Sequence, residues 1–164
     1  MARRVLAIVG AVLGVLGMAA GTAALAVPWA RYRVRGTVVG AGGVAREGAW
    51  QVYQLDFGDL YLVALMVLAG LLGGATLGSG RTRTIAGVVA PILGLATAIL
   101  VVVLVNRATV PHQVQAAGFA TLTVDPRVAA GAGFGLAAAA LLGFGAGLLA
   151  IGRTPGGSAE PPGS

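Results

Sequence analysis

The sequence contains no cysteine and no lysine, and only one of its 164 residues is a histidine. Without cysteine, the chain has no disulfide, no thiolate metal site and no cysteine nucleophile. The single histidine, His112, lacks partners at the spacing of a metal site or a catalytic triad, so we interpret it as an ordinary loop residue. Charged residues are only 10% of the chain and hydrophobic residues are 57%, with a mean hydropathy of +0.91. This composition excludes an ordinary soluble globular domain and predicts a membrane protein.

All eleven basic residues are arginines, and they give the chain a formal net charge of +6. They are scattered over the predicted loops and termini and form no continuous basic segment. Arginines that flank membrane spans account for such a charge balance. We therefore expect the lipid bilayer, and not nucleic acid, as a partner.

Four long uncharged runs predict transmembrane helices at residues 5–27, 60–78, 85–105 and 128–151. The outer loops are residues 28–59 and 106–127, and the four spans form a single domain over residues 1–153. The last residues, 154–164, are rich in proline and glycine and are expected to be disordered. The first run also has the outline of a signal peptide, but it exceeds the usual apolar region of about 7–15 residues, which favours a retained helix.

Glycines recur at helical spacing in the first two predicted spans. They are three or four residues apart in the first span and four apart in the second, which places each set on one helix face. Small residues on one face allow another helix to approach closely within a membrane. The predicted helix-packing residues are Gly10, Gly14, Gly17, Gly21, Gly70, Gly74 and Gly78.

The first outer loop contains two segments with the composition of β-strands. Residues 31–39 alternate arginines with larger apolar side chains, and residues 49–57 are rich in aromatic and β-branched types. The glycine-rich residues 40–43 predict a hairpin turn between them, and residues 120–124 are a candidate third strand. The predicted fold is an all-α membrane protein, a four-helix transmembrane bundle that carries a small extracytoplasmic β-sheet of two or three strands.

Acidic residues are expected at two helix starts. Asp59 is placed to cap the second span, and Asp125 followed by Pro126 is placed to start the fourth. Asp56 and Asp59 also fit a carboxylate pair, but capping is the favoured interpretation. We predict no catalytic, cofactor-binding or metal-binding residue. An enzyme would be considered only if Asp56, Asp59 and His112 converged in one cleft.

The arginines predict the orientation of the chain in the membrane. Five of them lie in short segments on one side of the predicted spans, and six are spread over the longer loops on the other side. The positive-inside rule, applied to the density of arginines in these segments, places both termini in the cytoplasm. The protein is expected in the plasma or inner membrane. Arg31, Arg33 and Arg35 oppose this orientation, since they crowd the start of the first outer loop.

Aromatic residues lie close to arginines in the first outer loop. This combination is typical of protein interfaces and of sites for glycans or lipid headgroups. The alternative, which is favoured, is that the aromatic side chains form the core of the small sheet while the arginines touch lipid phosphates. The predicted outer contact surface comprises Trp29, Arg31, Arg33, Arg35, Trp50 and Tyr53.

The layout of four helices, a longer first outer loop with strands and a shorter second loop resembles that of claudin-type tetraspan proteins. The likeness is topological, because the Trp–Gly-Leu-Trp–Cys–Cys signature of claudins is missing. Residues 62–98, with the segment Gly80-Arg-Thr-Arg-Thr-Ile-Ala-Gly87, resemble small four-span actinobacterial membrane proteins of the tryptophan-associated type. That resemblance implies a bacterial plasma-membrane protein and brings no activity or site residues with it.

Two hypotheses of function follow. No Asp, Glu, Arg, Lys or His lies within a predicted span, which argues against transport of charged species by this chain alone. The leading hypothesis is a non-enzymatic accessory, scaffold or self-associating subunit whose glycine-rich helix faces pack against a membrane-protein partner or in a homo-oligomer. The alternative is a binding module or transporter component that recognises a neutral or lipidic ligand at the outer sheet.

Overall fold

The computed structural model describes residues 2–38, 41–116 and 120–153, which form four helices, four strands and one short 3₁₀ helix. The helices are α1 (Ala2–Ala26), α2 (Gly58–Leu77), α3 (Gly80–Ala108) and α4 (Ala130–Arg153), and the 3₁₀ helix is η1 (Val52–Gln54). The strands are β1 (Ala30–Val38), β2 (Ala41–Trp50), β3 (His112–Ala116) and β4 (Ala120–Val128). The predicted tail, residues 154–164, lies outside the described residues.

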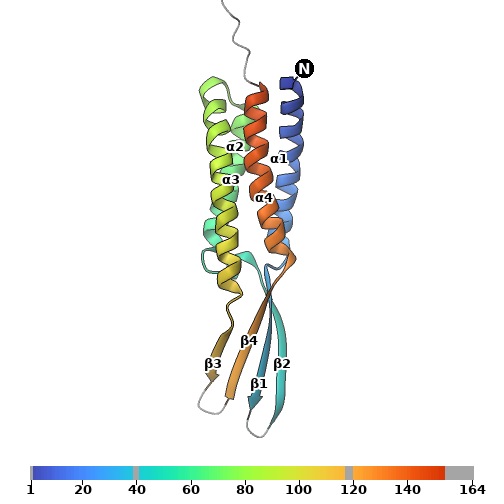
Figure 1. The fold of residues 1–164 in the computed structure, drawn as a ribbon, viewed down its shortest axis with the longest axis vertical. Coiled ribbons are helices and arrows are strands. Elements are labelled where there is room, and N and C mark those ends of the chain that lie inside the picture. The colour runs from blue at the N-terminus through green and yellow to red at the C-terminus, as the bar shows by residue number, and fades with distance from the viewer. Residues whose placement is uncertain (1, 39–40, 117–119, 154–164) are drawn as a thin grey trace, which may run out of the picture.

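The four helices form a bundle, and each is long and apolar enough to cross a membrane. The prediction of four such helices is confirmed, with each helix end within five residues of its predicted position. Helix α4 is central: it packs along α1 and α3 and also contacts α2. Figure 1 shows the N-terminus, the α2–α3 turn and the end of α4 at one end of the bundle, and the sheet projecting from the other.

Backbone-to-backbone contact joins α1 to α4. A Cβ atom added to Gly10 would lie 2.6 Å from the backbone nitrogen of Leu149, and one added to Gly145 would lie 2.8 Å from that of Gly14. No larger side chain fits at such separations unless the helices move apart. The glycine face of α1, predicted from its spacing, is thus covered by α4 and, at Gly14, by the Leu72 side chain of α2.

The glycines of α2 are in different surroundings. A Cβ atom on Gly70 would meet no atom within 4 Å, and one on Gly74 would make ordinary contacts with Thr82 and Ala86 of α3. Gly78 follows the end of the helix, and its backbone N–H donates to the carbonyl of Gly74 at 2.9 Å. Only part of the predicted glycine face of α2 therefore contacts another helix.

At the end of the bundle farthest from the sheet, two arginines donate to helix-terminal carbonyls. The Arg83 guanidinium donates to the carbonyls of Arg153, at 2.7 Å, and Gly78, at 2.6 Å. The Arg153 guanidinium in turn donates to the carbonyl of Thr76 in α2. Carbonyls in the last turn of a helix have no partner within it, so these bonds satisfy exposed acceptors and tie α2, α3 and α4 together.

The sheet has four antiparallel strands in the order β2-β1-β4-β3. Its central pair continues the α1–α4 pair, since β1 follows α1 and β4 precedes α4. Backbone hydrogen bonds close the junction: Ala129 N–H donates to Trp29 C=O, and Gly131 N–H donates to Pro28 C=O, both at 2.9 Å. The sheet is therefore attached rigidly to the bundle.

The strand predictions are partly wrong. The sheet has one strand more than the largest predicted number, and the second strand is Ala41–Trp50 instead of residues 49–57. Residues Gly42 and Gly43, predicted to lie in the turn, are part of β2, at an irregularity where its pairing with β1 passes from Gly36–Val44 to Val38–Ala41. Tertiary pairing outweighs the poor strand propensity of this segment. The 3₁₀ helix η1 then returns the chain to α2, and the Gln51 N–H donates to the Gln54 side chain at 2.9 Å.

The helix starts also differ from the prediction. Helix α2 begins at Gly58 with Phe57 as the N-cap residue, so Asp59 lies in the first turn and does not cap the helix. Phe57 has a φ of +66°, and a Cβ atom on Gly58 would lie 1.9 Å from the Val52 carbonyl oxygen, so a tight turn replaces the expected cap. Asp125 and Pro126 belong to β4, and α4 begins four residues later at Ala130.

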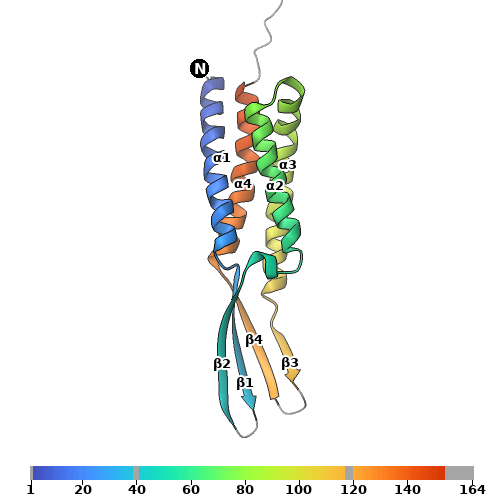
Figure 2. The same cartoon turned by 180° about the vertical axis from the view of Figure 1, so that it is seen from behind.

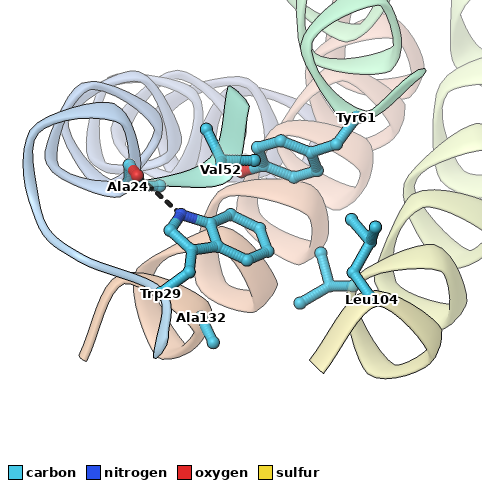
Figure 3. Close-up of a cluster of buried hydrophobic side chains, with 7 residues drawn as sticks. Ala24, Trp29, Val52, Tyr61, Leu104 and Ala132 are labelled. Atoms are coloured by element: carbon cyan, nitrogen blue, oxygen red, sulfur yellow. Dashed lines mark hydrogen bonds between the residues drawn. The ribbon is translucent and has the colours of Figure 1, made fainter. Parts of the chain in front are cut away.

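A buried cluster around Trp29 fills the junction between bundle and sheet, as Figure 3 shows. Trp29 is 1% exposed, and its ring packs edge-on against Tyr61 with 4.8 Å between centroids. Its Nε1–H donates to the Ala24 carbonyl in the last turn of α1 at 2.7 Å. Gly131 and Gly135, four residues apart on α4, leave the space for the indole, because a Cβ atom on either would lie 2.6 Å from it.

Candidate functional site

Side-chain alternation gives the sheet two chemically different faces. On the first, which we call the arginine face, Arg31 lies opposite Arg127, and Arg33 lies between Glu47 and Asp125. Arg35 lies opposite Thr123, one step farther from the bundle. All of these residues are exposed. This face is polar and carries four arginines, Arg31, Arg33, Arg35 and Arg127, against the two carboxylates of Glu47 and Asp125.

One ion pair is present on the arginine face. The Arg33 Nε donates to Glu47 Oε1 at 2.7 Å, and a second guanidinium nitrogen contacts the same oxygen. Both side chains are about half exposed or more, so the pair contributes at most about 1 kcal/mol. Its main effect is on the register of β2, because it joins residues directly opposite each other on β1 and β2.

The second face, which we call the aromatic face, is formed by Tyr32, Val34, Gly48, Trp50, Val124 and Pro126, with Arg46 at its edge on β2. The Tyr32 and Trp50 rings lie 4.6 Å apart between centroids, tilted by 30°. Tyr32 covers Gly48 so closely that a Cβ atom there would lie 2.3 Å from its ring. Glycine at position 48 is therefore required for the stacking of the two rings.

No described helix covers the aromatic face. Figures 1 and 2 show the sheet extending beyond the bundle, with no helix beside either side of it. Tyr32, Val34 and Val124 are partly exposed, whereas apolar sheet faces normally pack against a second layer. The aromatic face is thus an apolar layer whose covering layer is not supplied by the described residues.

A recess of about 190 Å³ lies at the base of the aromatic face, where the sheet meets α3. Its apolar walls are Trp50, Leu55 and Leu104, and its polar rim contains Gln54, Asp56 and Arg107. The Arg107 guanidinium lies over the exposed Phe57 ring, 5.2 Å from its centroid. A concave apolar recess beside a flat apolar face is an arrangement that accepts an anchoring side chain of a partner. We call the two together the docking site.

The predicted outer contact surface is not one surface. Trp29 is in the core and available to no partner, because the glycines of α4 leave space for it at the junction. Trp50 lies on the aromatic face, while Arg31, Arg33 and Arg35 lie on the opposite face. Tyr53, in η1, is 61% exposed. The prediction that these residues act together is therefore wrong.

The three residues considered for catalysis do not come from one element. Asp56 is exposed in the turn before α2, Asp59 is exposed in the first turn of α2, and His112 is the first residue of β3. Among the described residues, no group of three or more His, Asp or Glu side chains is placed to hold a metal ion.

Three residues of the docking site and the arginine face were missed in the sequence: Gly48, Leu104 and Arg127. Arg127 was detectable, because Thr123-Val-Asp-Pro-Arg127 continues the alternation of the predicted third strand past its assigned end. Gly48 and Leu104 carry no comparable pattern, since their roles depend on contacts between distant segments.

No protein-family model, curated protein or solved structure shows significant similarity to this chain. The resemblances to claudin-type proteins and to the tryptophan-associated type therefore stay predictions.

Proposed function

We propose that this chain is a non-enzymatic accessory protein of the plasma or inner membrane of a bacterium, whose bundle spans the bilayer and holds the docking site against a partner protein outside the cytoplasm. The observation that carries this proposal is the uncovered aromatic face on a sheet that is attached rigidly to the bundle. A rigid mount favours presentation of a surface, because little conformational freedom is lost when a partner binds.

The proposed orientation places both termini in the cytoplasm. Arg3, Arg4, Arg81, Arg83 and Arg153 then lie inside, close to the ends of short segments, as the positive-inside rule favours. The sheet, at the opposite end of the bundle, then lies on the outer side.

The packing of the helix glycines favours the docking site, and not a helix face, as the surface that contacts a partner. The close-packed glycines of α1 contact α4 of the same chain, so this face is not free for a second chain. A Cβ atom on Gly70 of α2 would meet no described atom within 4 Å, so that position packs against no other helix of the chain. Self-association through α1 is therefore not part of the proposal.

The chemistry of the docking site defines the partner's surface. It requires an apolar patch that covers Tyr32, Val34 and Val124, with one projecting side chain that enters the recess beside Leu104. Arg46 and Arg107 at the edges favour carboxylates at the rim of that patch.

Site-specific photocrosslinking in cells tests this function. A photoreactive residue at position 34, on the aromatic face, is expected to give a discrete protein adduct. The matched control is position 123, which lies on the arginine face one residue farther from the bundle and is expected to give none. The same crosslinking is repeated with the purified chain. An adduct of twice the mass of the chain would identify a second copy as the occupant of the docking site. Equal labelling from both positions, or none from either, contradicts the proposal.

A further inference from the structure

The two arginines of the sheet closest to the bundle face each other. Arg31 on β1 and Arg127 on β4 are direct partners in the antiparallel register, and both are exposed. Like charges in this position destabilise a sheet unless another charge lies between them. Among the described residues, the one ion pair of this face joins Arg33 to Glu47 and includes neither Arg31 nor Arg127.

The carboxylates of the arginine face do not neutralise the cluster. Asp125 and Glu47 both lie opposite Arg33, one step farther from the bundle than Arg31 and Arg127. The four arginines of this face exceed its two carboxylates and leave a net positive charge. The excess lies on the side next to the bundle.

A surface hollow next to Arg31 combines this charge with apolar walls. The hollow is about 270 Å³ and is lined by Val27, Pro28, Arg31, Val128, Ala129 and Ala130. A second hollow, of about 310 Å³, extends from Arg31 and Arg127 along the arginine face. Ala130 begins α4, whose first turn contains no acidic residue, so the positive end of the helix dipole also faces this hollow without a compensating carboxylate.

In the proposed membrane placement, the hollow lies at the level of the lipid headgroups. It lies directly after the last residue of α1, Ala26, and directly before the first residue of α4, so its apolar walls continue the surfaces of two candidate membrane spans. A ligand there has its charged group beside Arg31, which also lines the second hollow together with Arg127, and its apolar part against Val27 and Val128, which is 58% exposed.

We propose that Arg31 and Arg127 together bind the phosphodiester group of an anionic phospholipid at the outer boundary of the bundle. Arginine binds phosphate oxygens through paired, charge-assisted hydrogen bonds, and one phosphodiester between the two guanidinium groups offsets their repulsion. The inference rests on the proposed membrane placement of the chain, and it is independent of the docking site on the other face.

Lipid binding by the purified full-length chain in a non-ionic detergent tests this inference. Native mass spectrometry measures the adducts formed with phosphatidylglycerol and, separately, with phosphatidylcholine. The double variant Arg31→Gln/Arg127→Gln is expected to bind phosphatidylglycerol about tenfold more weakly than the unaltered chain, as the loss of charge-assisted hydrogen bonds predicts. The control is Arg35→Gln, on the same face but farther from the bundle, with binding expected to change by less than about twofold.

Three results would overturn the inference. They are equal binding of phosphatidylglycerol by the double variant and the unaltered chain, equal binding of the two lipids, and thermal stabilisation by inorganic phosphate as large as that by phosphatidylglycerol. The last result would assign the site to a free anion instead of a lipid. If the double variant does not fold, each single variant is measured, and each is expected to bind several-fold more weakly. Because no partner protein takes part, failure here leaves the docking proposal to its own crosslinking test.

Discussion

Replacing Gly145 with leucine is expected to lower the free energy of unfolding by about 3 kcal/mol or more, since the new side chain has no space between α4 and α1. Even a Cβ atom at this position would lie 2.8 Å from the Gly14 nitrogen and 3.0 Å from the Gly10 carbonyl oxygen. Both are backbone atoms, so no side-chain rotation can relieve the overlap. The two helices must separate, and the α1–α4 contact is the most extensive in the bundle.

Gly133→Leu is the matched control for this substitution. Gly133 lies on the same helix, is exposed and would have no atom within 4 Å of an added Cβ. The change is therefore expected to alter stability by less than about 1 kcal/mol, since leucine has the better helix propensity. Unfolding in mixed micelles with increasing sodium dodecyl sulfate, followed by tryptophan fluorescence, measures both. Equal stability of the two variants would show that α1 and α4 do not pack as described.

Replacing Trp29 with alanine is expected to cost about 3–5 kcal/mol, the range for removal of a large buried aromatic side chain. The indole fills the junction between bundle and sheet, contacts Tyr61 and donates to the Ala24 carbonyl, which as part of the last turn of α1 needs a partner. Its loss leaves a cavity at the point where the sheet is attached, so the sheet is expected to lose its fixed position before the bundle unfolds.

Two further variants separate the parts of this effect. Trp29→Phe keeps a ring against Tyr61 but loses the hydrogen bond to Ala24, and is expected to cost about 1–3 kcal/mol. Trp50→Ala removes a partly exposed tryptophan from the aromatic face and is expected to cost less than Trp29→Ala. Near-ultraviolet circular dichroism and thermal unfolding in detergent measure the series. A Trp29→Ala variant as stable as Trp50→Ala would contradict the role of Trp29.

The helices were predictable because each is a long uncharged run, and the requirement to span a bilayer sets the length. The glycine spacing of α1 correctly indicated one buried face, but spacing does not identify the helix that fills it. That information lies in α4, whose many small residues could face α1, α3 or another chain. Only the assembled bundle distinguishes these options.

The sheet was harder to predict, because its strands are held by pairing more than by propensity. Residues 41–50 are mostly glycine, alanine and charged residues, and they form a strand since β1 offers a matching edge. The aromatic residues at 49–57 looked more like a strand, but Val52 is buried at the junction and the chain there turns towards α2. The position of Trp29 was wrongly predicted for a similar reason. Tryptophan near the end of a span is usually found at the membrane interface. Here two glycines of a distant helix leave space for it in the core.

The two faces divide the proposed contacts of the chain. The aromatic face and its recess are suited to an apolar partner, and the arginines next to the bundle are suited to an anionic headgroup. Because the two surfaces lie on opposite sides of one rigid sheet, occupation of one does not obstruct the other.

The central claim, that the bundle spans the membrane and presents the sheet on the outer side, is tested most directly by cysteine labelling in intact cells. The chain has no cysteine, so single substitutions give no background. Thr123→Cys places an exposed thiol on the sheet, and Ser79→Cys places one in the α2–α3 turn at the opposite end of the bundle. A membrane-impermeant maleimide is predicted to label Thr123→Cys in intact cells and Ser79→Cys only after permeabilisation. Labelling of Ser79→Cys in intact cells, or protection of Thr123→Cys, would contradict the account.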